Sequence, residues 1–161
     1  MGVVWYQQCY HIAMRIVVDT NVFVGACMGI GASNKIVALC ISGRLMPLMG
    51  TALLTEYEDV LARQSLFEGC RLGQAERDEL LDIFLARCQW TRIFFGWRPN
   101  LPDEGDNHLF ELAVAGTAKK IVTRNLSDLQ GGELTNTFIN PATFRASDTF
   151  ARKARWRRHS C

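Results

Sequence analysis

The sequence lacks several features that would assign it to a specialised class of protein. It contains six cysteines, but none forms a C-x-x-C pair and none stands at zinc-ligand spacing from a histidine. No apolar stretch is long enough to span a bilayer, because residues 16–32 are interrupted by Asp19, Asn21 and several glycines. Charged residues make up only 21% of the chain and hydrophobic residues 48%, which is typical of one soluble globular domain. Cys40 and Cys88 fall in apolar helical patterns, and we expect them to be buried and reduced.

The first thirteen residues have no clear periodicity and no basic segment, and they include Gln7, Gln8 and His11. They make a poor signal peptide, so we expect a cytoplasmic protein without a membrane segment. Met14 directly precedes the first predicted strand, which raises the hypothesis that residues 1–13 are an extension upstream of the true start. The intact mass of the natively expressed protein tests this hypothesis.

The net charge of +2 is unevenly distributed along the chain. Residues 151–161 contain no acid and carry five bases, namely Arg152, Lys153, Arg155, Arg157 and Arg158, while the rest of the chain holds more acids than bases. We therefore divide the chain into an extension at 1–13, a domain at 14–147 and a basic tail at 148–161.

Predicted strands and helices alternate along the domain. Strands are expected near residues 15–18, 45–49, 120–123 and 137–139, with a further strand or covered loop at 90–97. A loop is expected at 25–31, followed by helices at about 33–42, 51–61, 74–88 and 107–116, with Ser33 and Thr51 as N-caps of the first two. This alternation predicts an α/β fold, a three-layer α/β/α sandwich with a central parallel sheet of four to five strands.

The run Arg15-Ile-Val-Val-Asp19-Thr-Asn21 is the most informative segment. Its apolar residues are typical of a strand covered on both faces, so Asp19 is expected at the strand's carboxyl end, where ligands bind in open α/β sheets. A charge at this place is unfavourable unless something pairs with it, and a metal ion would do so. The simpler interpretation is an aspartate that caps the next turn.

Three further acids lie near the edges of the same pattern: Glu56, Asp106 and Asp128. Each has a simpler interpretation alone, as a helix cap, a turn cap or a solvent-facing residue, and Glu58 and Asp59 are expected to face solvent. Their joint placement favours a site, because carboxylates brought together repel one another and attract a hard cation. Mg²⁺ or Mn²⁺ held there would activate water for attack on a phosphodiester, with either one or two ions.

Four segments in order resemble PIN domains, and most closely the bacterial PIN toxins of toxin–antitoxin pairs. They are Val17-Val-Asp19-Thr-Asn21, Thr55-Glu56-Tyr57 with Val60-Leu61, Asp103-x-x-Asp106-Asn107, and Ile121-Val-Thr123-Arg-Asn125-x-x-Asp128-Leu129. The resemblance covers roughly residues 14–145.

The resemblance implies a ribonuclease dependent on Mg²⁺ or Mn²⁺. By position, Asp19, Glu56 and Asp106 match the family's three central acids, and the fourth position is filled by either Asp128 or Asn125, of which we favour Asp128. Thr20, Asn21, Asn125 and Thr123 resemble supporting polar residues, and Asp103 a supporting acid or a helix cap. The family's toxins cut RNA, are silenced by a small antitoxin protein and are often homodimers.

Basic side chains are needed to contact RNA phosphates. Lys35, Arg44, Arg63 and Arg124 are candidates, and Arg124 is the best placed because it adjoins the predicted site. The tail, in which Trp156 lies among the cations, could bind single-stranded RNA or remain a solvated segment.

Two other functions remain open from the residues alone. A doubly wound phosphatase could form a phospho-aspartate at Asp19, but it would want a second acid where this chain has Asn21, and a receiver domain would want a lysine after a late strand. The same fold could also bind RNA or a protein without cleaving anything. Dependence on a divalent metal distinguishes a nuclease from such a binding module.

Overall fold

A computed structural model describes residues 13–94, 107–126 and 138–144. Its centre is a five-stranded sheet in the order β3-β2-β1-β4-β5, and every neighbouring pair is parallel. The strands are β1 (Met14–Val18), β2 (Leu45–Met49), β3 (Gln89–Trp90), β4 (Lys120–Val122) and β5 (Phe138–Ile139). The predicted parallel sheet is therefore confirmed, and β1 is its central strand.

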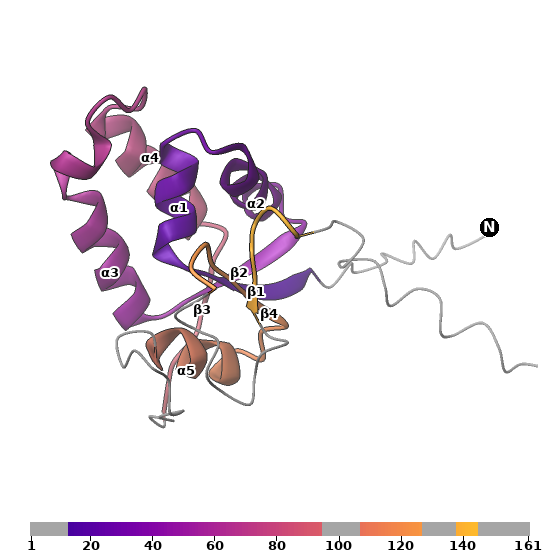
Figure 1. The fold of residues 1–161 in the computed structure, drawn as a ribbon. Helices are drawn as coiled ribbons and strands as arrows, with labels where there is room; N and C mark the ends of the chain where they lie inside the picture. Colours follow the sequence, from indigo (N-terminus) through magenta and orange to yellow (C-terminus); the bar gives the residue numbers. More distant parts are fainter. Residues whose placement is uncertain (1–12, 95–106, 127–137, 145–161) are drawn as a thin grey trace, which may run out of the picture.

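Helices cover both faces of this sheet (Figure 1). On one face lies α5 (Asn107–Ala115), which contacts β1, β2 and β4. On the other lie α1 (Thr20–Cys27), α2 (Gly31–Ile41), α3 (Thr51–Leu61) and α4 (Gln74–Leu85), with the short 3₁₀ helix η1 (Gln64–Phe67) between the last two. This arrangement confirms the predicted three-layer sandwich.

The central strand is buried because both of its faces are covered. Ile16 and Val17 are fully buried, and so are the rings of Phe23, Tyr57 and Phe84, which pack against one another with centroids 5.2–6.1 Å apart. The hydroxyl of Tyr57 donates a hydrogen bond of 2.9 Å to the carbonyl oxygen of Val18. This bond fixes α3 against the carboxyl end of β1, which positions the residue next to Tyr57, Glu56.

The structure corrects several predicted boundaries. Helix α1 begins directly after Asp19 and continues to Cys27. Its last three residues therefore belong to the segment 25–31, which was expected to be a loop. Gly25 lies within the helix and does not break it. A Cβ at this position would lie 2.7 Å from Ser33 Oγ, so the glycine permits close packing of α2. Gly50 rather than Thr51 is the N-cap of α3, and α2 starts at Gly31, so Ser33 is not a cap.

Helix α4 ends at Leu85, three residues before the predicted end at Cys88. Cys40 is buried as expected, and Cys88 is partly buried. No single helix in the described ranges is long and apolar enough to cross a membrane, whereas α1 and α2, bent by 105° at the break between them, pass the same test only as a pair.

Candidate active site

The site lies where β1 and β4 end side by side. Val18 and Val122 are partners in the parallel register, and the Asp19 N–H continues the pairing with a 2.9 Å hydrogen bond to the Val122 carbonyl oxygen. Asp19 and Thr123 are therefore the first residues beyond neighbouring strands, and both side chains are buried. This is the edge of a parallel sheet at which ligands are expected.

The carboxylate of Asp19 is held by two polar side chains. Its Oδ2 accepts hydrogen bonds of 2.7 Å from Thr123 Oγ1 and 2.7 Å from Asn21 Nδ2. Thr123 Oγ1 in turn accepts a 3.1 Å bond from the backbone N–H of Asn125, and Asn21 Oδ1 accepts a 3.0 Å bond from the N–H of Arg124. The network ties α1 to the segment after β4, so the orientation of Asp19 is set both by its neighbour Asn21 and by Thr123, which is 104 positions away.

Burial and charge act on Asp19 in the same direction. Burial of the carboxyl group raises the pKa of Asp19 above its ordinary value, the Thr123 hydrogen bond lowers it, and the negative charge of Glu56 raises it. The raised pKa shows that the surroundings do not fully compensate the charge of Asp19. A cation placed beside it would supply the missing compensation.

Glu56 reaches the same edge from α3, and it is paired with a histidine. Glu56 Oε2 lies 2.7 Å from Nε2 of His108 on α5, and its side chain is 36% exposed. The His108 hydrogen bond lowers the pKa of Glu56, although partial burial opposes this, and the Thr20 hydroxyl lowers it further. Glu56 therefore favours the ionised form, and its charge acts on Asp19, so the two side chains lie within electrostatic reach of each other.

The other predicted acids, Asp103, Asp106 and Asp128, lie outside the described residues. Over the described ranges, no group of three or more His, Cys, Asp or Glu side chains is placed to hold a metal ion. The structure thus brings together half of the predicted set of four acids, and the places of Asp106 and Asp128 in it remain predictions. Asn125 is exposed, and its backbone N–H takes part in the network around Asp19.

Two observations fit the predicted Mg²⁺ or Mn²⁺. Asp19 and Glu56 supply carboxylate oxygens, the ligand type that these hard cations prefer. Thr20, the residue after Asp19, is buried, and its Oγ1 forms no hydrogen bond that meets ordinary geometry within the described ranges. A buried hydroxyl of this kind suits a site completed by an ion and its water.

Arg124 lies beside the site, as its position in the sequence suggested. Its backbone is bonded to Asn21, and its guanidinium Nη1 lies 3.0 Å from the point where a Cβ on Gly25 would stand. The backbone of Arg124 therefore adjoins the network around Asp19, while its side chain is exposed and its guanidinium lies near Gly25 of α1. Lys35, Arg44 and Arg63 are exposed as well.

Two contacts at the site were not predicted from the sequence: that of His108 with Glu56 and that of Tyr57 with Val18. His108 had no assigned role, and Tyr57 was noted only as part of a motif. The position of His108, two residues after Asp106 at the start of a predicted helix, was the one signal available. Its partner Glu56 is 52 positions earlier on another helix, so local sequence patterns could not predict the contact.

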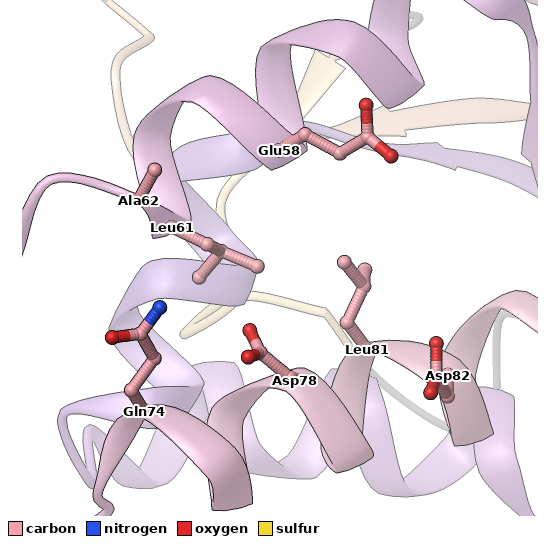
Figure 2. A pocket seen from close by; sticks show the side chains of 7 residues that line it. All are labelled: Glu58, Leu61, Ala62, Gln74, Asp78, Leu81 and Asp82. Carbon is pink, nitrogen blue, oxygen red and sulfur yellow. The ribbon is translucent and has the colours of Figure 1, made fainter.

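A second acidic feature lies away from this edge. A cavity of about 260 Å³ between α3 and α4 is lined by Glu58, Asp78 and Asp82 around the apolar side chains of Leu61 and Leu81 (Figure 2). Glu58 is only two positions from Glu56, so the two side chains lie on different faces of α3. Glu58 and Asp59 are both exposed, as expected.

Comparisons with known proteins agree with this geometry. Residues 15–127 match the PIN domain family. A solved structure described as VapBC2 from Rickettsia felis bound to a DNA fragment from their promoter is similar in fold, with a TM-score of 0.56 and 16% identity. The match covers 79% of this chain and 98% of the other. Among curated proteins, no match is found.

Proposed function

The chain belongs to the PIN domain family, and we propose that it is a ribonuclease that hydrolyses RNA phosphodiester bonds with Mg²⁺ or Mn²⁺. The observation that carries the proposal is the pairing of a buried Asp19 with an ionised Glu56 at the carboxyl ends of β1 and β4. Two carboxylates next to each other in a partly dry site are unfavourable without a cation. Such a site attracts a divalent cation, which is what a metal-dependent nuclease requires.

Asp19 and Glu56 would hold the metal, and we propose that Asp106 and Asp128 complete the set. The ion, when bound, polarises water and the phosphate group. Thr123 and Asn21 keep the carboxylate of Asp19 in one orientation through their 2.7 Å hydrogen bonds, so little rearrangement is needed on metal binding. The hydroxyl of Thr20, which acts on the carboxylate of Glu56, can also bond a water in the site.

The substrate assignment rests on charge as well as on family membership. Arg124 adjoins the acids and is exposed, so its guanidinium can contact a phosphate of RNA bound across the site. The basic tail is a further candidate for contacts with the RNA backbone. A non-catalytic binding module is the alternative, and it would make no use of the metal.

We also propose that the protein is the toxin of a toxin–antitoxin pair. The support is the fold shared with VapBC2, which was solved as a complex on promoter DNA, together with the PIN family match. The expected partner is a small antitoxin protein that blocks the acidic edge, the expected assembly is a homodimer, and the expected location is the cytoplasm, where RNA is available.

Cleavage of a structured RNA by the wild type and by Asp19→Asn, each with Mn²⁺ and with EDTA, tests the proposed activity. We expect cleavage by the wild type with Mn²⁺ only, and none by the variant. Cleavage in EDTA, or equal cleavage by Asp19→Asn, would contradict the assignment. RNA binding without cleavage by either protein would favour the binding module.

A further inference from the structure

We propose that His108 is a positioning residue, which holds the carboxylate of Glu56 in place for the divalent cation. The inference rests on the proposed metal-dependent function and adds a residue to it. The nitrogen Nε2 of His108 lies 2.7 Å from Oε2 of Glu56, so the two side chains are in direct polar contact. Both side chains are only partly exposed, at 19% for the histidine and 36% for the glutamate.

The contact joins two helices on opposite sides of the sheet edge. Glu56 belongs to α3 and His108 to the first turn of α5, and the two helices contact each other. A free glutamate side chain has several rotatable bonds, and fixing it on metal binding loses conformational entropy. A partner that already holds one carboxylate oxygen reduces this loss, so the other oxygen is presented to the ion in a nearly fixed position.

Histidine suits this task better than a lysine or an arginine would. With its proton on Nε2, the neutral ring donates one hydrogen bond and leaves the negative charge of Glu56 available to a cation. A permanently charged side chain at 2.7 Å would neutralise the carboxylate and compete with the metal. The contact also ties Glu56 on α3 to the first turn of α5.

Calorimetric titration of the metal-free protein with Mn²⁺ tests the inference, using His108→Met and His108→Gln. Both replacements are unbranched and form helices well, but only glutamine keeps an N–H donor. We expect His108→Met to bind Mn²⁺ about 10- to 100-fold more weakly than the wild type, the usual loss when a residue that orients a metal ligand is removed. His108→Gln should recover most of this loss.

The same change in a Glu56→Gln background separates positioning from packing. With the carboxylate gone, His108→Met should reduce Mn²⁺ affinity no further, because the two residues act as one unit. A His108→Met protein that binds Mn²⁺ as tightly as the wild type, or a His108→Gln protein as weak as His108→Met, would overturn the inference. A wild type that binds no Mn²⁺ would instead overturn the proposed metal site, and the inference with it.

Discussion

Within the described residues, two groups of acids differ in burial and in the contacts that hold them. At the sheet edge, Asp19 is buried, receives hydrogen bonds from Thr123 and Asn21, and lies near an ionised Glu56. In the cavity between α3 and α4, Glu58, Asp78 and Asp82 are all exposed and line the space together with Leu61 and Leu81 (Figure 2).

The difference shows that the number of carboxylates does not define a site. Water screens the cavity acids, so their mutual repulsion is small and no counter-ion is required. At the sheet edge, burial leaves the charge of Asp19 without full compensation and raises its pKa. The charge of Glu56 is compensated in part by His108. Burial and hydrogen-bonded support distinguish the site, and the following experiments test that distinction, with variants of the exposed acids as controls where the chain offers them.

The largest difference is expected between two glutamates of α3. Glu56→Gln should lower the rate of Mn²⁺-dependent RNA cleavage by more than about 100-fold, because a ligand matters more than a residue that only orients one. Glu58→Gln, the same change two positions away on the exposed face, should leave the rate unchanged. Equal losses in the two variants would show that the site is not confined to the sheet edge.

The next largest effect is expected at Thr123, whose hydroxyl donates to Asp19. Thr123→Val removes the donor at nearly constant volume and should weaken Mn²⁺ binding about 10- to 100-fold in a calorimetric titration. Thr123→Ser keeps the hydroxyl and serves as the control. If the valine variant bound Mn²⁺ normally, the hydrogen bond would have no part in holding the ligand.

A smaller effect is expected from Tyr57→Phe, which removes the bond from the buried hydroxyl to the Val18 carbonyl oxygen. The loss should lower the free energy of unfolding by about 1–2 kcal/mol, visible as a lower urea midpoint at constant slope. Cleavage activity of the folded variant should change less than in Glu56→Gln. An unchanged midpoint would mean that this bond does not stabilise α3 against β1.

The last comparison concerns pH and the stability of the metal-free protein. Because the pKa of Asp19 is raised in the folded state, its contribution to stability is fully present below its ordinary value of 3.8 and is lost as pH rises through the folded-state pKa. Asp19→Asn stays neutral, so its stability relative to the wild type should increase from acidic to neutral pH. Asp78→Asn, at an exposed position, should stay within about 0.5 kcal/mol of the wild type. A constant difference for Asp19→Asn would contradict the raised pKa.

Local patterns in the sequence were enough to predict the layers of the fold and the place of Asp19. The apolar run of residues 15–18 identified the central strand, and the motifs at Asp19 and Glu56 identified two acids that the structure places near each other. The sequence did not predict a helix over residues 20–27, because the glycines at 25, 29 and 31 are typical of a loop. Gly25 instead lies inside the helix, where it allows the close approach of Ser33 on α2. The role of His108 was hidden for a similar reason, since it depends on a contact between helices far apart in the chain.

The most direct test of the account is the melting temperature of the wild type, Asp19→Asn and Asp78→Asn with and without Mn²⁺. An ion that binds only the folded state stabilises it by about 2.7 kcal/mol at a hundred times its dissociation constant. We predict a clear rise for the wild type, an equal rise for Asp78→Asn, and the loss of most of the rise in Asp19→Asn. A rise in Asp19→Asn equal to that of the wild type would place the metal elsewhere and contradict the account.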